Sequence, residues 1–251
     1  MLIDKSLSEL LNLLKNKEVK SEEIIDESIT QIKMHGEKIN AFITVVDPKI
    51  KIGLPYVMKD SYLTKGIRTT CASNILKNFI APYSATVYEK LAHMTLVGKM
   101  NMDAWGHGGS SENTNFGPVK NPWDLTRVAG GSSGGPAAAV AARLVPFAIG
   151  EDTGGSIRNP ADWCGITGLK VTYGRVSRYG CIAYASSFDT MGPMAKTAED
   201  CAIILGWIAG KDPYDATTSS MPVSNYIEEL KKDVKKIKIG VPKELFGEGL
   251  D

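Results

Sequence analysis

The sequence predicts an α/β fold in which helices cover a central sheet. Segments with helical and with strand patterns alternate along its 251 residues, which is the order expected of such a fold. Hydrophobic residues make up 43% of the chain, enough to bury one substantial core. Two glycine-serine clusters stand where predicted strands end and helices begin. We therefore expect a single domain over residues 1–251.

Charge and cysteine usage narrow the class of protein. The 29 basic and 28 acidic residues give a net charge of +1, which excludes an overall field that would recruit nucleic acid or an anionic membrane. The four cysteines have no CxxC or metal-ligand spacing. The amino terminus has no signal-peptide pattern, and no stretch reaches the roughly 20 apolar residues of a membrane span. We expect a soluble, cytoplasmic protein.

The first half of the chain begins with two predicted helices. Ser6 and Glu9 fit a capping box ahead of a stripe of leucines that ends at Leu14. Ser21 is expected to cap the second helix, and Gly36 is expected to end it. Short strands are then expected over 39–46 and 54–58, followed by a helix that runs into a strand over 85–98.

In the second half, Pro136 is expected to open an alanine-rich helix, because the first turn of a helix does not need the N–H that proline lacks. A buried strand is expected over 145–150, ending at the second glycine-serine cluster. The pattern then predicts helices over 197–210 and 225–236 and a strand over 237–241. The chain stops at GEGLD directly after that strand, so we expect a fragment of a larger domain.

The glycine-serine clusters GGSSGG (130–135) and DTGGSIR (152–158) are the candidate site. Neither contains GxxxxGK[ST] or GxGxxG, so phosphate binding is weakly supported. GSSGG matches the GxSxG nucleophile elbow, but that mechanism needs a histidine after the serine, and all three histidines precede it. No S-x-x-K tetrad occurs either. Turns chosen only for backbone freedom are the plain structural alternative.

A lysine in place of histidine gives a third interpretation of these clusters. A buried lysine can lose its proton near neutral pH, because burial penalises the ammonium form, and it then acts as a general base. Lys59 follows the apolar strand pattern LPYVM, which would draw its side chain into the core. Ser132 is then placed to relay a proton, and Ser156 to attack a carbonyl group beside backbone N–H donors.

With that lysine, the two clusters resemble the amidase signature family. Matching segments extend through most of the chain: TTCAS, GKMNMD, GGSSENT, NPWD, GLKVTYGRVSRYG, ASSFDTMGPM and GKDPYDATT. Within the family, the similarity is greatest to the amino-terminal half of the A subunits of glutamyl-tRNA(Gln) amidotransferases. The resemblance implies a central mixed, twisted sheet covered by helices on both faces. It also implies a single amidase-signature domain over 1–251 that lacks its carboxy-terminal half.

The resemblance also implies roles for the site residues. Lys59 would be the catalytic lysine, Ser132 the bridging serine after a cis peptide bond, and Ser156 the serine that forms the acyl-enzyme. The implied oxyanion donors are the backbone amides of Thr153, Gly154, Gly155 and Ser156. Asp152 would orient this loop or cap the helix after it, and Arg158 would support the loop or face solvent. No metal site is implied.

For the activity, the resemblance implies hydrolysis of the glutamine side-chain amide, which supplies ammonia for conversion of Glu-tRNA(Gln) to Gln-tRNA(Gln). The implied assembly is a heterotrimer with B and C subunits. The B subunit would bind the tRNA and use ATP and Mg²⁺, so this chain itself would need no cofactor. Two alternatives stay open: a stand-alone amidase acting on small amides, and a non-catalytic fragment of the same fold.

The sequence departs from the family pattern at several positions. A helix of roughly twenty residues, the length of a long globular helix, is usual before LPYVM and is reduced here to residues 47–53. This shortening would disturb the seating of Lys59. Glu151 stands where a serine is usual, and Ser61 where an asparagine is usual. None of these changes removes a catalytic atom.

Overall fold

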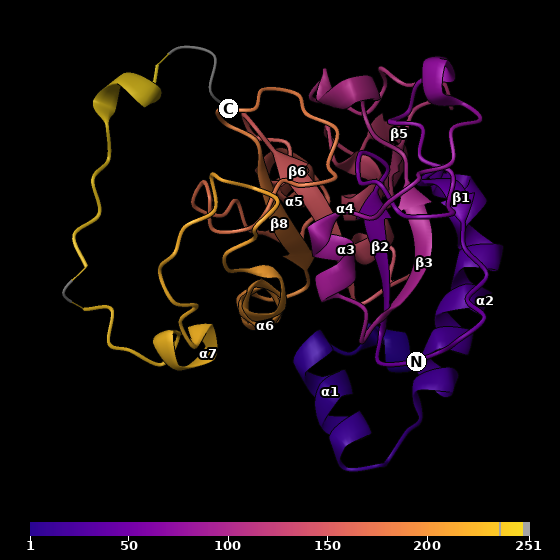
Figure 1. Ribbon diagram of the computed structural model, residues 1–251, viewed down its shortest axis with the longest axis horizontal. Coiled ribbons are helices and arrows are strands. Elements are labelled where there is room, and N and C mark those ends of the chain that lie inside the picture. The colour runs from indigo at the N-terminus through magenta and orange to yellow at the C-terminus, as the bar shows by residue number, and fades with distance from the viewer. Residues whose placement is uncertain (236, 248–251) are drawn as a thin grey trace.

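The structure of the chain, a computed structural model, describes residues 1–235 and 237–247 (Figure 1). In this part of the chain the central sheet has six strands in the order β1-β3-β2-β6-β8-β7. Its strands are β1 (Phe42–Val45), β2 (Pro55–Lys59), β3 (Thr95–Met100), β6 (Phe147–Asp152), β7 (Thr167–Gly168) and β8 (Thr190–Ala195). Strand β2 runs parallel to both β3 and β6, whereas the β1–β3, β6–β8 and β7–β8 pairs are antiparallel. The sheet is therefore mixed, as the resemblance implies.

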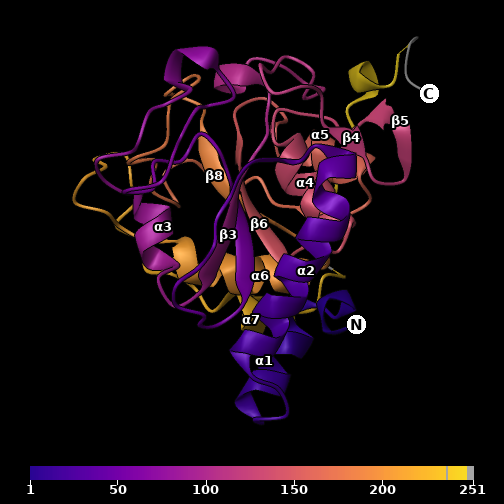
Figure 2. The same ribbon diagram turned by 90° about the vertical axis from the view of Figure 1, so that its right-hand side faces the viewer.

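Helices cover both faces of this sheet (Figure 2). They are α1 (Leu7–Lys15), α2 (Ser21–Ile39), α3 (Thr86–Lys90), α4 (Gly134–Ala141), α5 (Arg158–Trp163), α6 (Ala198–Ile208) and α7 (Tyr226–Glu229). Helices α1, α3 and α6 share one apolar cluster with Tyr56 and Met58 of β2, and α2, α4 and α5 share another with Val57. Successive strand residues point to opposite faces, so one strand supplies both layers of the core.

The remaining short elements lie on the rim. They are the β4 (Lys120–Asn121) and β5 (Asp124–Val128) hairpin and the 3-10 turns Leu2–Asp4, Asn74–Leu76, Ala104–Gly106 and Lys243–Leu245. Among the described residues, no helix is both long enough and apolar enough to cross a membrane.

The two amino-terminal helices form where the sequence predicts them, with corrections at both ends of the second. Ser21 does not cap α2: the N-cap is Lys20, and Ser21 is the first residue of the helix. The capping box of α1 is present: the Glu9 amide donates to the Ser6 hydroxyl at 3.2 Å, and the Ser6 amide donates to the Glu9 carboxylate at 2.7 Å. Helix α2, however, continues through Gly36 to Ile39. The left-handed residue that ends it is Asn40, at φ 50°, whose side-chain amide donates to the Phe116 carbonyl at 3.0 Å. A polar C-cap with a tertiary partner thus ends the helix in place of the glycine.

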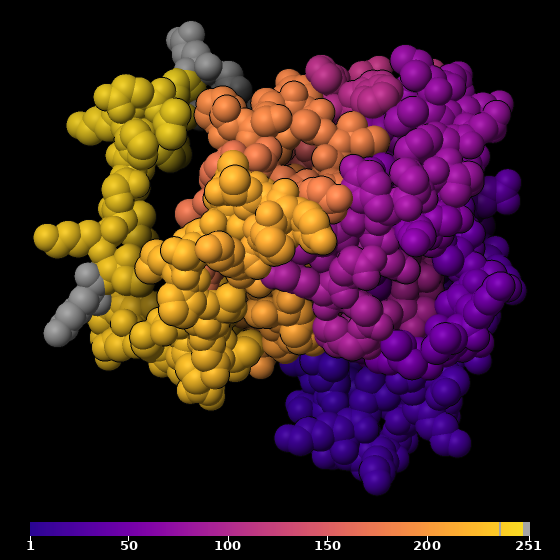
Figure 3. All heavy atoms as spheres, in the orientation of Figure 1, coloured from indigo at the N-terminus to yellow at the C-terminus, as the bar shows by residue number. Residues whose placement is uncertain are grey.

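The expected elements at the carboxy-terminal end are wrong. The helix predicted over 225–236 is only the single turn α7, and residue 236 lies outside the described residues. The strand predicted over 237–241 does not form. Its alternating apolar side chains Ile237, Ile239 and Val241 are 64%, 85% and 66% exposed. Alternation favours a strand only where a sheet edge accepts it, and this segment stands away from the body over most of its length (Figure 3).

The sequence pattern does not predict strand β8, which lies between β6 and β7 in the sheet. All six of its residues are buried, so its sequence TMGPMA carries no alternation of polar and apolar residues. Gly192 and Pro193 also argue against a strand. A Cβ at Gly192 would collide with the Leu169 carbonyl oxygen, which explains the glycine.

Candidate active site

Lys59 is the last residue of β2, and its side chain is buried under the loop that precedes α4. Its exposed fraction is 0%, and its Nζ donates a hydrogen bond to the Ser132 Oγ at 2.7 Å. The Nζ also donates to the Glu151 carbonyl at 3.4 Å. The structure therefore brings together two of the three residues proposed for catalysis. The short 47–53 segment does not displace Lys59 from this position.

The loop that carries Ser132 is held by buried polar contacts. The Gly131–Ser132 peptide bond is cis, as the resemblance implies. The Ser132 carbonyl accepts hydrogen bonds from the Asp103 amide at 3.2 Å and the Ser111 hydroxyl at 3.4 Å. Gly131 packs against the Asp103 carboxylate so closely that a Cβ would collide with it. A glycine is needed here because the backbone lies directly on a side chain.

Ser133 connects this loop to the second cluster. Its hydroxyl donates to the Glu151 carbonyl at 3.1 Å and accepts from the Glu151 amide at 3.3 Å. Its own amide donates to the Ser156 carbonyl at 3.1 Å. These three bonds place the Ser156 backbone beside the Lys59–Ser132 pair. In the described part of the chain, the Ser156 hydroxyl itself makes no hydrogen bond, and the side chain is half-buried.

Asp152 organises the turn that leads to Ser156. Its carboxylate accepts from the amides of Gly155 at 2.8 Å, Ile157 at 3.0 Å and Arg158 at 3.3 Å. The Arg158 guanidinium adds two further bonds of 3.1 Å. Burial raises the pKa of the Asp152 carboxyl, but the bonds from Arg158, Ile157 and Gly155 outweigh it, so the pKa is lowered overall. Asp152 thus shapes the loop and accepts from the amide of Arg158, the first residue of α5, whose N-cap is Ile157. The Arg158 side chain is its ion-pair partner.

The backbone amides proposed as oxyanion donors divide into two groups. The Gly155 N–H is occupied by Asp152 in this structure. The amides of Thr153, Gly154 and Ser156 have no acceptor among the described residues. A Cβ built on Gly154 or Gly155 would meet nothing within 4 Å, so one side of this turn is open. Open space beside free N–H groups is what an oxyanion of a bound substrate requires.

Glu151 and the Asp60–Lys99 pair are buried charged groups beside this site. Glu151 Oε2 lies 3.5 Å from Lys59 Nζ, and burial raises the pKa of the carboxyl. Lys99 Nζ lies 3.0 Å from Asp60 Oδ1, and both side chains are 0% exposed. From the sequence, Glu151 is noted only as a departure from the family, and no contact is predicted for it. Its neighbour across the strands becomes visible only once β2 and β6 are paired.

Comparisons with known proteins identify the family of this chain. The amidase family profile matches residues 23–251. The A subunit of the glutamyl-tRNA(Gln) amidotransferase of Geobacillus kaustophilus is 51% identical over 271 aligned positions, which cover 100% of this chain and 56% of the relative. The protein of the same name from a Sulfurihydrogenibium species is 49% identical over 98% of this chain and 55% of the relative.

Solved structures show the same fold. The crystal structure of the A subunit of the glutamyl-tRNA(Gln) amidotransferase of Thermotoga maritima superposes with a TM-score of 0.84 at 44% identity, covering 89% of this chain and 50% of that one. The 6-aminohexanoate cyclic dimer hydrolase gives a TM-score of 0.86 at 28% identity, over 93% and 52% of the two chains. This chain spans about half the length of the relatives it matches. It belongs to the amidase family.

Proposed function

We propose that this chain hydrolyses the side-chain amide of glutamine to glutamate and ammonia, as the A subunit of a tRNA-dependent amidotransferase. The observation that carries the proposal is the buried 2.7 Å contact between Lys59 Nζ and Ser132 Oγ, next to the backbone of Ser156. The names of its relatives supply the reaction, because they are the A subunits of glutamyl-tRNA(Gln) amidotransferases.

The proposed chemistry uses only groups of this site. The Ser156 Oγ attacks the amide carbon while its proton passes through Ser132 to the neutral amine of Lys59. The oxyanion that forms accepts hydrogen bonds from the free amides of Thr153, Gly154 and Ser156. Lys59 then returns the proton to the nitrogen, the C–N bond breaks, and ammonia leaves. Water hydrolyses the acyl-enzyme by the same route and releases glutamate.

The proposed assembly places the remaining chemistry on other chains. Ammonia would pass to a B subunit that binds tRNA and uses ATP and Mg²⁺ to convert Glu-tRNA(Gln) to Gln-tRNA(Gln). A C subunit would complete a cytoplasmic heterotrimer. No cofactor is assigned to this chain.

The direct test is the Ser156→Ala variant in the assembled complex. Removal of the Oγ nucleophile is expected to lower glutamine-dependent ammonia release by about 10³-fold or more, the usual loss for a nucleophile that acts within such a unit. The matched control is Ser187→Ala, an exposed serine on the rim, which should retain full activity. Unchanged ammonia release in Ser156→Ala would refute the proposal. Hydrolysis of small amides by the isolated chain, with no glutaminase activity in the complex, would favour a stand-alone amidase instead.

A further inference from the structure

The Glu151 carboxylate lies in the interior of the sheet and touches the lysine of the site. Oε2 is 3.5 Å from Lys59 Nζ, and the two side chains are 3% and 1% exposed. Oε1 is buried and has no hydrogen-bond partner among the described residues. The parallel pairing of β2 with β6, with Met58 opposite Ile149, brings the ends of the two strands together. A buried carboxylate is costly unless a cation compensates it, and Lys59 is that cation.

The other titratable groups around the Glu151–Lys59 pair are neutral or already have partners of their own. The negative charge of Glu151 raises the pKa of three neighbouring groups, the thiols of Cys71 and Cys181 and the phenol of Tyr62. Burial raises the pKa of Cys71 to about 12 and those of Cys181 and Tyr62 well above their usual values. These groups therefore stay neutral over the pH range in which an enzyme is assayed.

Two carboxylates complete the charged surroundings. Asp189 raises the pKa of Glu151 through its own negative charge, but its oxygens are held by the Thr153 hydroxyl at 2.6 Å and by backbone amides. Asp60 is paired with Lys99. Lys59 is thus the cation left to compensate Glu151.

We propose that Glu151 is a positioning residue that pairs with Lys59, directs its amine toward Ser132 and makes the reaction of Ser156 depend on this pair. The proposal rests on the proposed function for the role of Lys59. A carboxylate beside an ammonium group favours the charged form, and Glu151 is the carboxylate that lies against this amine. When Ser156 reacts, its proton re-forms the ammonium beside the carboxylate. Glu151 itself forms and breaks no covalent bond.

Ser61 is a further buried polar residue beside this pair. Ser61 and Lys59 both oppose the effect of burial, which raises the pKa of the Glu151 carboxyl.

The first experiment follows the labelling of Ser156 by a fluorophosphonate probe across pH. In this reaction the Ser156 oxygen bonds to phosphorus, fluoride leaves, and the serine proton goes to Lys59. The labelling rate should rise with pH in the unmodified chain. In Glu151→Gln the rising limb should move to lower pH by about 1–3 units, the effect of one neighbouring opposite charge. Glu89→Gln, the same change at an exposed position of α3, should leave the limb in place.

An unmoved limb in Glu151→Gln would overturn the inference. If Glu151→Gln does not fold, Glu151→Ser also removes the carboxylate, and the same shift is expected. If it too shows the original limb, the inference is overturned.

A second experiment measures the ionisation of Glu151 and needs no reaction at Ser156. The Glu151 carboxyl carbon is followed by ¹³C NMR as pH is changed, with the signal assigned by its loss in Glu151→Gln. In Lys59→Met the carboxyl should titrate about 1–3 units higher, because its cation is gone. An equal titration in both proteins would refute the pairing. Failure of the unmodified chain to react at Ser156 would refute the proposed function alone, since this titration would still decide whether Glu151 and Lys59 act together.

Discussion

The carboxylate of Asp152 holds the turn on which Ser156 stands, and its removal has a predictable effect on stability. Asp152→Asn keeps the shape of the side chain but removes its negative charge, and five donor groups bond to that carboxylate. Hydrogen bonds to a charged group contribute roughly 1.5–3 kcal/mol each in favourable cases, and they are not additive. We expect the free energy of unfolding at pH 7 to fall by about 2–4 kcal/mol, measured by urea denaturation.

The pH dependence of this loss has a defined sign. The folded pKa of Asp152 lies below its ordinary value of 3.8, so the carboxylate stabilises the fold above that value and the stabilisation is lost as pH falls through the folded pKa. The difference between Asp152→Asn and the unmodified chain should therefore shrink in acid. A difference that is constant from pH 7 to pH 2 would contradict this assignment. Asp47→Asn, at an exposed position of the 47–53 segment, is the control.

Some single residues of the site could be predicted from the sequence, and others could not. Lys59, Ser132 and Ser156 are predicted because strand pattern, glycine spacing and family motif coincide at those positions. Their catalytic roles stay predictions. The buried partners Glu151 and Asp103 have no such local signal, because an acidic residue in sequence is most simply a solvated one. Their contacts arise from strands and loops that are distant in the chain.

The start of helix α4 sets the position of the loop that carries Ser132. Gly135 allows the helix to begin close to the end of β3. A Cβ at Gly135 would collide with the Asn101 carbonyl oxygen at the end of β3 and lie 2.7 Å from that of Ala41. Gly135→Ala should lower the free energy of unfolding by about 1–3 kcal/mol, the usual cost of overpacking, measured by thermal denaturation. In Gly206→Ala on α6, where a Cβ meets nothing within 4 Å, the same change should stabilise by about 0.5–1 kcal/mol. Equal effects at the two sites would contradict this account.

Elements with a local code were predicted well, and elements defined by tertiary contacts were not. Helix α1 forms because its capping box and leucine stripe agree. Strand β8 lacks any periodic signal because both of its faces are buried. The segment 237–241 has the opposite problem: it carries the pattern of a strand but has no neighbouring strand in the described part of the chain. Periodicity reports which side chains seek burial, not whether a partner is present.

The amino-terminal segment is tied to the far end of the sheet, and this contact belongs to the architecture as a whole. Lys196, after β8, donates to the carbonyl of Lys5 at 2.8 Å and also to that of Ile3. The Ser8 amide donates to the Asp200 carboxylate at 3.0 Å. The first eight residues thus close over helix α6.

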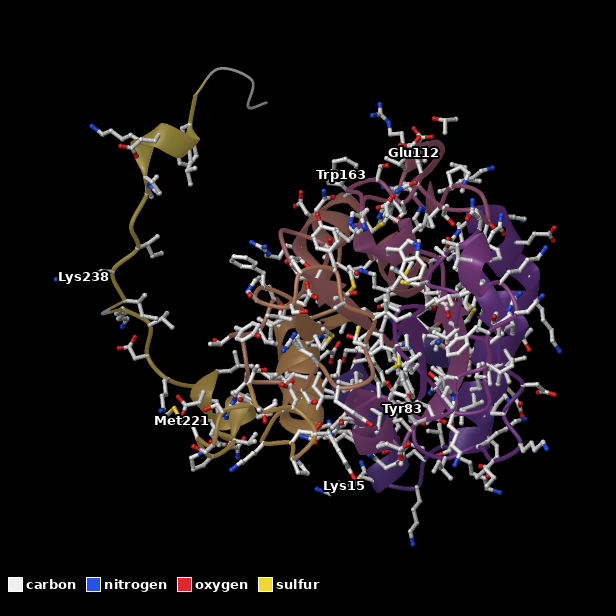
Figure 4. The ribbon with its side chains drawn as sticks, turned by 45° about the horizontal axis from the view of Figure 1, so that its top comes forward. Lys15, Tyr83, Glu112, Trp163, Met221 and Lys238 are labelled. Atoms are coloured by element: carbon white, nitrogen blue, oxygen red, sulfur yellow. The ribbon has the colours of Figure 1, made fainter. Side chains whose placement is uncertain are left out.

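Loss of the Lys196 contacts should loosen α1 without unfolding the core. In Lys196→Met, hydrogen-exchange protection of the α1 amides should fall about tenfold, equivalent to the roughly 1.5 kcal/mol of a charged hydrogen bond. Lys15→Met, at the exposed end of the same helix (Figure 4), should leave protection unchanged. Equal protection in Lys196→Met and the unmodified chain would show that these contacts do not hold the helix.

The extended segment after α7, which carries Lys238 far from the body (Figure 4), has a practical consequence. Its apolar side chains alternate on an unpaired backbone, and its strongest members, Ile237, Ile239 and Val241, face water. Such a stretch adheres to any free strand edge, including the same stretch on another molecule. Concentrated preparations of this chain will therefore tend to cluster through residues 237–241. A lysine in place of Ile239 is the change that would keep them dispersed.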